Sequence, residues 1–294
     1  MPLYRDEGVV LRTAKLGEAD RIITLLTRGH GKIRAVAKGV RRVKSRFGAR
    51  LEPFMRADLL IAQGRSLDVV SQAESVAAYA EPICADYDAY TAANVIVETA
   101  DKIVGAEEER VVGQYRLLIG ALNALAKHAH APDQISASYV MRALALAGWS
   151  PRLHACVVCG QRRFTECFTG GFTGVDVGDS GDAGNGGAAA ETQSLQRFTD
   201  GFTGGSRSGV SRSGVSRSGV LYLSIPAGGL MCAKDHTPEA KRITPLALAQ
   251  LEALADGDWA ELDGRELAPE TARLVEDWAE YYLERPLRSM RLLD

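Results

Sequence analysis

The first 79 residues alternate apolar and polar positions in short stretches, a pattern typical of half-buried strands. Segments rich in glycine separate the stretches, as turns between strands do. The last two stretches flank Gln63-Gly64-Arg65 and predict a hairpin. The predicted strands cover residues 9–13, 21–27, 32–38, 58–62 and 67–71.

Five short strands with no long helical period predict a small closed β-barrel. The oligonucleotide-binding (OB) barrel is the commonest such fold of five strands, although periodicity alone does not separate it from an SH3-like barrel. We therefore expect an α+β protein in which residues 1–79 form a five-stranded OB-type domain.

Beyond residue 80 the apolar period becomes that of α-helices, so residues 80–294 are expected to form a helical domain. One helix is predicted to begin after Asp86, and another to run from the acidic segment 107–109 to Lys127 and His128. The other predicted helices cover 136–147, 245–255 and 270–285. The side chains expected to face the core are Tyr87, Tyr90, Val97, Val104, Val111, Tyr115, Leu118, Ile119, Leu122, Leu125, Leu274, Trp278 and Tyr281.

Residues 165–220 interrupt this helical domain with low-complexity sequence. Phe168 and Phe202 each begin an FTGG segment, and SRSGV occurs three times between residues 206 and 220. Such a composition buries too little apolar surface to offset the entropy lost on ordering, so we expect a disordered insertion.

Charge is distributed unevenly along a chain whose formal net charge is −2. Residues 1–75 carry 15 Lys or Arg and 8 Asp or Glu, a net of +7, whereas the remaining 219 residues carry 20 and 29, a net of −9. The imbalance predicts that contact with a polyanion is concentrated near the N-terminus.

The densest basic segment is 28–50, which holds nine Lys or Arg residues and no acid. Its first half, KIRAVAKGV, alternates like a strand, and its second half has no apolar period and is expected to be a loop. A strand that leads into a basic loop predicts a binding surface for phosphates. Phe47 and Phe54 are the nearby candidates for stacking on bases, so stacking is expected to contribute little.

Two cysteine segments flank the insertion, Cys156-Val157-Val158-Cys159 and Gly228-Gly229-Leu230-Met231-Cys232. A C-x-x-C turn directs two thiolates to one point, and Cys232 with His236 completes a Cys3His set that suits structural zinc. The residues proposed to form this zinc module are about 153–237. Asp235 and Cys167 are the alternatives to His236 as fourth ligand.

Enzymatic motifs are missing from the sequence, so no catalytic residue is predicted. Gly29-His30-Gly31-Lys32 lacks the spacing and the Ser or Thr of a phosphate-binding P-loop. Ala155 stands where a zinc deaminase needs Pro. Cys84 is expected to be a small buried apolar residue and not a nucleophile.

Several motifs together resemble the opening of the bacterial RecO family of recombination and repair proteins, in particular its actinobacterial members. They are GEADRI at 17–22, LLTRGHGK at 25–32, AKGVRR at 37–42, KSRFG at 44–48 and LEPF at 51–54. The cysteine segments and the C-terminal YYLERPLRSMRLL are similar to the zinc module and closing helix of that family. The long insertion and the final His in place of Cys depart from its usual pattern.

The resemblance implies an OB domain, a helical domain with zinc, and a mediator that binds single- and double-stranded DNA and anneals complementary strands. It implies association with RecR, recognition of the C-terminal tail of single-strand-binding protein, and indirect help in loading RecA. The DNA-contacting residues that it and the basic segment predict are Arg34, Lys38, Arg41, Arg42, Lys44, Arg46 and Arg50.

Two other functions are compatible with the same sequence. The helical domain could serve as an interaction scaffold that does not anneal strands, and the barrel could bind RNA. Because neither a secretory signal nor an apolar segment long enough to span a bilayer is present, we expect a cytoplasmic, nucleoid-associated protein with no membrane partner.

Overall fold

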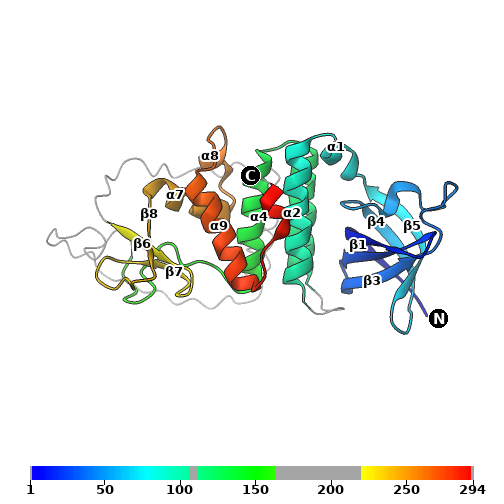
Figure 1. Ribbon diagram of the computed structural model, residues 1–294, viewed down its shortest axis with the longest axis horizontal. Helices are drawn as coiled ribbons and strands as arrows, with labels where there is room; N and C mark the ends of the chain where they lie inside the picture. The colour runs from blue at the N-terminus through cyan, green and yellow to red at the C-terminus, as the bar shows by residue number, and fades with distance from the viewer. Residues whose placement is uncertain (1, 106–110, 163–219, 293–294) are drawn as a thin grey trace, which may run out of the picture.

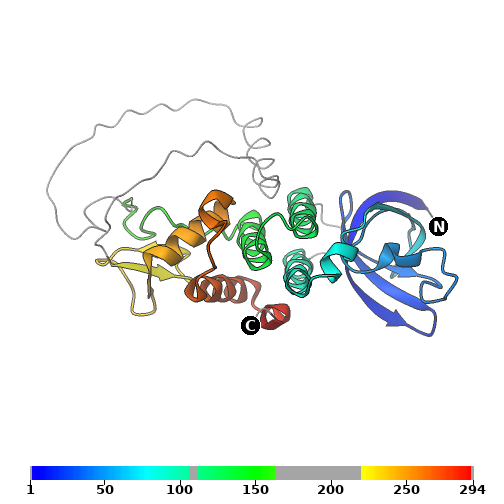
Figure 2. The same cartoon turned by 90° about the horizontal axis from the view of Figure 1, so that it is seen from above.

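The computed structural model describes residues 2–105, 111–162 and 220–292. A β-barrel lies at one end of the long axis, helices occupy the centre, and a small sheet lies at the other end (Figures 1 and 2). The prediction of an α+β protein with an N-terminal barrel and a helical remainder is confirmed.

The barrel closes in the strand order β1-β2-β3-β5-β4. All neighbours are antiparallel except β3 and β5, which run parallel where Ala35 faces Asp68 and Val36 faces Val69. This closure is the OB arrangement, so strand order separates the two barrels that periodicity could not. The strands are β1 Leu3–Leu16, β2 Asp20–Thr27, β3 Gly31–Ala37, β4 Arg56–Ala62 and β5 Asp68–Ala77.

Strand β1 is much longer than the predicted 9–13 because its two halves pair with different neighbours. Its first half pairs with β4, from Leu3 opposite Ala62 to Val9 opposite Arg56. Its second half pairs with β2, and the register shifts between Val10 and Arg12. Such a bulge bends a strand and lets it belong to two sides of a barrel.

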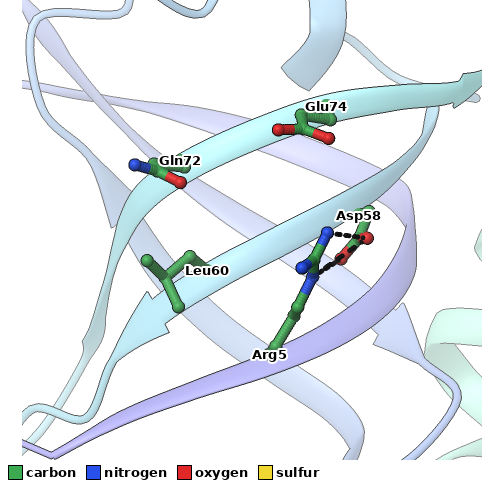
Figure 3. Close-up of a pocket in the computed structure, with 5 residues that line it drawn as sticks. All are labelled: Arg5, Asp58, Leu60, Gln72 and Glu74. Atoms are coloured by element: carbon green, nitrogen blue, oxygen red, sulfur yellow. Dashed lines mark hydrogen bonds and ion pairs between the residues drawn. The ribbon is translucent and has the colours of Figure 1, made fainter.

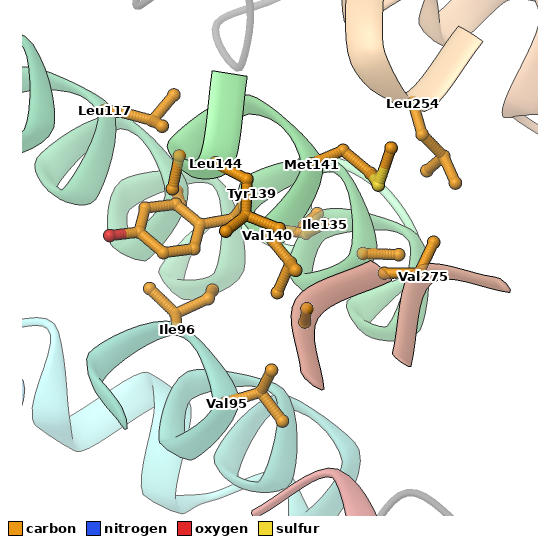
Figure 4. Close-up of a cluster of buried hydrophobic side chains, with 14 of the residues drawn as sticks. Val95, Ile96, Leu117, Ile135, Tyr139, Val140, Met141, Leu144, Leu254 and Val275 are labelled. Carbon is orange, nitrogen blue, oxygen red and sulfur yellow. The ribbon is translucent and has the colours of Figure 1, made fainter. Parts of the chain in front are cut away.

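The helical domain is built around α4, which begins at Pro132, four residues before the predicted start at Ser136. Figure 4 shows its side chains Tyr139, Val140, Met141 and Leu144 packed among residues from four other helices. The helices are α1 Ala80–Cys84, α2 Tyr87–Ile103, α3 Val112–Ala126, α4 Pro132–Leu146, α7 Pro245–Asp256, α8 Trp259–Leu262 and α9 Pro269–Leu283, with 3-10 turns η1 Gly48–Leu51 and η2 Arg288–Leu292.

Helix ends follow the local signals in the sequence. The Asp86 side chain accepts hydrogen bonds from the Asp88 and Ala89 N–H groups at 2.9 and 3.2 Å. Thr244 caps α7 in the same way, and Gly257 ends it with a left-handed φ of 71°. These caps satisfy backbone groups that have no partner within the helix.

Three tyrosines differ from the predicted core. Tyr87, Tyr90 and Tyr281 are 71, 41 and 49% exposed, whereas we expected them to face inward. The first turns of α2 bury small residues instead, Ala89, Ala92 and Ala93, and Val95, Ile96 and Val97 continue the face that packs on α4. In α9 it is Tyr282, and not Tyr281, that packs against Trp278 and Trp149.

Cys84 also departs from the prediction, because its side chain is exposed. The preceding residue, Ile83, is fully buried and fills the position at the junction of barrel and helices. Successive residues of a helix point in different directions, so when Ile83 faces the core Cys84 faces the solvent.

A three-stranded sheet beyond the insertion was not predicted. Strand β6 (Leu221–Ser224) lies between β7 (Gly229–Met231) and β8 (Lys241–Ile243), and both pairings are antiparallel. Strands of three or four residues are too short for an alternation to be recognised in sequence.

The barrel contacts the helices through both apolar and polar groups. Val9, Leu11 and Leu26 of the barrel belong to the same buried cluster as the helices. The Tyr115 hydroxyl donates a 2.6 Å hydrogen bond to Glu7 Oε1, which also accepts from Arg56. Asp101 of α2 pairs with Arg12 and Lys32 of the barrel.

Two predictions lie outside the described residues: the acidic helix start at 107–109 and the disordered insertion, apart from Val220. Among the helices that the structure describes, none has the length and apolar character required to cross a membrane.

Candidate nucleic-acid interface and metal cluster

Strand β3 and the loop that follows it carry the basic side chains that the sequence predicted as DNA contacts. All seven are exposed to solvent. Both views place the loop before η1 on the side of the barrel away from the helices (Figures 1 and 2). We call this surface the cationic rim; it consists of Arg34, Lys38, Arg41, Arg42, Lys44, Arg46 and Arg50.

Backbone hydrogen bonds attach the loop to the neighbouring turn between β1 and β2. The Gly39 N–H donates to Asp20 Oδ1 at 2.7 Å, and the Arg41 N–H donates to the Ala19 carbonyl at 3.0 Å. Gly39 has a φ of 69°, a left-handed conformation that glycine adopts without strain. The base of the loop is therefore held in one position on the barrel.

Apolar side chains anchor the same loop from inside. Val40 and Phe47 are 9 and 1% exposed and belong to the barrel core. The guanidinium carbon of Arg46 lies 4.8 Å from the centre of the Phe47 ring, in cation–π contact. The loop thus displays its cations from a buried support.

The two phenylalanines considered for base stacking are not available to DNA. Phe47 fills the barrel, and Phe54 is 2% exposed and packs edge-on against Tyr90 with ring centres 6.0 Å apart. One ring belongs to the core of the barrel and the other to its junction with the helices. Stacking on bases therefore contributes even less to DNA binding than the sequence suggested.

Not every cation of the basic segment reaches the rim. The Lys32 ammonium donates to the Asp101 carbonyl at 2.8 Å, and its side chain is only 13% exposed. Because β3 begins beside α2, this lysine joins the barrel to the helices.

A shallow depression lies on the outer face of the barrel, over β1, β4 and β5 (Figure 3). It encloses about 100 Å³. Arg5 pairs with Asp58 inside it at 2.7 Å, which raises the pKa of Arg5 and lowers that of Asp58. With its cation already paired and Glu74 beside it, this depression does not favour a phosphate.

A second site lies beside the small sheet at the opposite end of the molecule. Cys156, Cys159, Cys232 and Asp235 bring one sulfur or carboxylate oxygen each to within 4.8 Å of one another. Cys156 and Cys232 are buried, and Cys159 is exposed. Asp235 Oδ2 lies 3.2 Å from Cys232 Sγ and 3.8 Å from Cys156 Sγ.

Close backbone approach builds this cluster from two distant segments. The Val157 N–H donates to the Leu230 carbonyl at 2.8 Å, and the Leu230 N–H donates to the Arg152 carbonyl at 2.9 Å. A Cβ on Gly229 would lie 2.3 Å from the Arg152 carbonyl oxygen, so only glycine allows the segments to meet. This contact is the structural reason for the second glycine of the Gly-Gly pair before Leu-Met-Cys.

His236, which we expected as the fourth ligand, lies outside the group. Its Nδ1 is 3.0 Å from the Ala233 carbonyl, and its ring stacks on Tyr222 with centres 3.9 Å apart. The Asp235 N–H donates to the Cys232 carbonyl at 3.2 Å, and this tight turn brings Asp235, and not the next residue, back to the sulfurs. Cys167, the other alternative, lies outside the described residues.

The surroundings of the cluster favour the deprotonated forms of Cys156 and Asp235. Burial raises the pKa of the Cys156 thiol, but N–H groups of Cys159, Cys232 and Val158 lower it by more, and the pKa ends below its ordinary value. Hydrogen bonds from Cys159 and Cys232 lower the pKa of Asp235. Thiolate and carboxylate are the forms that bind metal.

Three sulfurs and one carboxylate oxygen fit a tetrahedral zinc ion. Bonds of about 2.0–2.3 Å place tetrahedral ligands roughly 3.5–4 Å apart. Asp235 Oδ2 lies 3.2 and 3.8 Å from the sulfurs of Cys232 and Cys156, and all four ligand atoms lie within 4.8 Å of one another. Four protein ligands would leave no position for a substrate, so a metal here could stabilise the module but not catalyse.

The fold and the sites define a class of protein: an OB-type barrel with a cationic rim, joined to a helical domain that carries a cysteine-rich cluster able to bind a metal ion. The family described as "Recombination protein O N terminal" matches residues 1–79, and "Recombination protein O C terminal" matches residues 84–213. The chain belongs to the RecO family, which acts in DNA repair and recombination.

Similar proteins from bifidobacteria agree with this assignment over the whole chain. The chain is 59% identical to "DNA repair protein RecO" of Bifidobacterium adolescentis over 298 residues, which cover 100% of each chain. It is 59% and 58% identical to proteins of the same name from Bifidobacterium longum subsp. infantis and Bifidobacterium longum, again over 100% of each chain.

Proposed function

We propose that the protein binds single- and double-stranded DNA through the cationic rim, without reading its sequence, and anneals complementary strands. The observation that carries the proposal is the exposure of all seven rim cations, on strand β3, on the turn η1 and on the loop between them, which is fixed by Asp20, Val40 and Phe47. Phosphates are the groups of DNA that such a surface attracts, and they are the same in every sequence.

Annealing requires no bond to be made or broken, so we assign no enzymatic activity. Two DNA strands repel each other through their phosphates, and a rim that neutralises phosphates lowers this repulsion. The bases then remain free to pair because no exposed aromatic ring of the described rim competes for them. Family membership supports action with RecR and with the tail of single-strand-binding protein, and indirect help in loading RecA; such a role places the protein at the nucleoid in the cytoplasm.

We further propose that Cys156, Cys159, Cys232 and Asp235 bind a structural zinc ion, with Asp235 in place of the expected His236. Zinc supplies a fixed tetrahedral junction when bound. The protein contributes thiolates from two segments of the chain, and their joint ligation would hold these segments together behind the DNA-binding barrel.

The test of DNA binding is charge reversal in the rim. Arg41, Arg42 and Lys44 are changed together to Glu, and affinity for a single-stranded oligonucleotide is measured by fluorescence anisotropy across a salt series. Each lost phosphate contact reduces the log–log salt slope by about 0.7. A matched control reverses three exposed cations of the C-terminal part, Lys127, Arg242 and Arg273, which changes net charge equally.

We expect the rim variant to lose affinity and salt dependence, and the control to keep both. An unchanged slope in the rim variant would refute the interface. Strand annealing is then followed by fluorescence transfer between labelled complementary strands. Binding without annealing would favour the scaffold, and preference for RNA over DNA of equal length would favour an RNA-binding factor.

A further inference from the structure

Val43 is an apolar side chain at the centre of the cationic rim. It is 104% exposed, the highest value among the large apolar side chains that the structure describes. The other two large apolar residues of the loop, Val40 and Phe47, are buried in the barrel. Val43 therefore takes no part in the support of the loop.

The local backbone turns Val43 outward. The Ser45 N–H donates to the Arg42 carbonyl at 2.9 Å and closes a turn in which Val43 and Lys44 are the two central residues. Central residues of a turn project away from the chain on either side. The loop is attached at both ends, by Asp20 to Gly39 and by Phe47 in the core, so the valine is presented from a fixed position.

The surroundings of Val43 indicate what it contacts. Arg41, Arg42, Lys44 and Arg46 flank it, and no acid occurs between residues 28 and 50. A ligand that matches this surface presents anionic groups around an apolar one. DNA offers both: phosphates for the flanking cations and, between successive phosphates, the apolar faces of the bases.

We propose that Val43 enters between adjacent bases of a DNA strand held by the rim and unstacks them. This inference rests on the proposed function and adds to it a contact with the bases. Apolar side chains such as Leu and Ile unstack base steps of duplex DNA as wedges in proteins that bend it, and an exposed valine offers the same kind of branched apolar group. Separated bases of one strand are accessible to a second strand, so the wedge assists annealing without reading sequence.

The experiment uses the full-length protein and a single-stranded oligonucleotide that contains 2-aminopurine, whose fluorescence increases when it unstacks. Fluorescence is measured at saturating protein, and the salt slope is measured by anisotropy on the same oligonucleotide. The variants are Val43→Ser and Val43→Leu. Val76→Ser is the matched control, because Val76 is a 46% exposed valine of the same barrel in the sequence Glu74-Ser75-Val76-Ala77, without flanking cations.

We expect the fluorescence increase to fall by at least about twofold in Val43→Ser, and the affinity to fall about fivefold as part of a valine side chain loses its apolar contact. The salt slope should be unchanged. Val43→Leu should retain or enlarge the increase, and Val76→Ser should match the unmodified protein. Because the Val43 side chain is fully exposed, thermal unfolding of its variants should match that of the unmodified protein.

The two proposals fail in different ways. If Val43→Ser and Val43→Leu give the same fluorescence as the unmodified protein, the wedge is refuted while DNA binding through the rim stands. If charge reversal of Arg41, Arg42 and Lys44 leaves binding intact, the rim assignment is refuted and the wedge with it.

Discussion

The hydroxyl of Tyr115 in α3 donates a 2.6 Å hydrogen bond to Glu7 of the first barrel strand. Residues 108 positions apart in the chain thus join the barrel to the helical domain. Glu7 also accepts from Arg56, so one carboxylate connects two strands and a helix. This shared contact holds the rim-bearing barrel in a defined orientation on the helices.

Changing Tyr115 to Phe should therefore destabilise the protein by about 1–2 kcal/mol, because the Glu7 carboxylate loses a hydrogen-bond donor in a half-buried interface. Chemical denaturation monitored by circular dichroism measures the loss. Tyr87→Phe is the control, since the Tyr87 side chain is 71% exposed and its variant should unfold like the parent. Equal stability of both variants would show that the interface does not depend on this bond.

The same tyrosine predicts a loss of stability at alkaline pH. Burial, together with the hydrogen bond and charge of Glu7, raises the pKa of Tyr115 above its ordinary value of 10.0. Because the folded pKa is raised, the stabilisation is complete below pH 10 and declines above it, where the unfolded tyrosine ionises and the folded one does not. Burial raises the pKa of Tyr139 in the same direction. In Tyr115→Phe the free energy of unfolding should therefore fall less steeply above pH 10, and the fall that remains should be the one due to Tyr139. Chemical denaturation at a series of alkaline pH values measures both.

Phe47 should be needed for the shape of the rim and not for its charge. Phe47→Ala removes a fully buried ring and should cost about 3–5 kcal/mol of folding stability. At a temperature where the variant remains folded, its affinity for DNA should fall although every cation is retained, because a loosened loop must be ordered on binding. Phe47→Leu, which keeps an apolar anchor, should retain most of the affinity. Undiminished affinity in Phe47→Ala would mean that the loop needs no anchor.

Zinc content should distinguish the two neighbouring candidates for the fourth ligand. Asp235→Ala should lower both bound zinc and the melting temperature, whereas His236→Ala should leave zinc in place and lose only the stack on Tyr222. Elemental analysis of protein purified without chelator, paired with thermal unfolding, makes the comparison. If His236→Ala lost zinc and Asp235→Ala kept it, His236 and not Asp235 would be the fourth ligand.

Glu98 should fix the C-terminal turn η2 to helix α2. Its carboxylate accepts from the Arg288 and Ser289 N–H groups at 3.1 and 2.8 Å and pairs with Lys102 at 2.7 Å. Burial opposes ionisation, but Lys102 and the Ser289 and Arg288 donors outweigh it and lower the pKa of Glu98 below 4.5. A lowered folded pKa gives stability that is present above the unfolded pKa and lost as pH falls toward the folded one.

Glu98→Gln should therefore lower stability by about 1–2 kcal/mol at neutral pH and less below pH 4.5, where the parent loses the same contribution. Denaturation midpoints measured at neutral and acidic pH test this. A difference that stays constant across the pH range would show that the charge of Glu98 is not what holds the turn.

Much of the architecture could be predicted from local patterns. Alternation in β3 buries Ile33, Ala35 and Ala37, and it predicted a strand because neighbouring residues of a strand face opposite sides. The cap Asp86 marked a helix start because it acts on backbone groups a few residues away. The cationic segment was also recognisable, since its charges are contiguous in the chain.

Other features depend on contacts between distant segments. Phe47 and Val43 are both apolar residues of one basic loop, and only the closure of the barrel decides that the first is core and the second is exposed. Likewise the position of Asp235, and not His236, beside the cysteine sulfurs follows from a turn at Cys232 that faces Cys156 and Cys159, which lie more than seventy positions earlier in the chain. The amino-acid sequence by itself determined the elements, their caps and the basic character of one segment, because these depend on neighbours along the chain. The tertiary structure decided which side chains meet, because burial and ligation are properties of space and not of sequence distance.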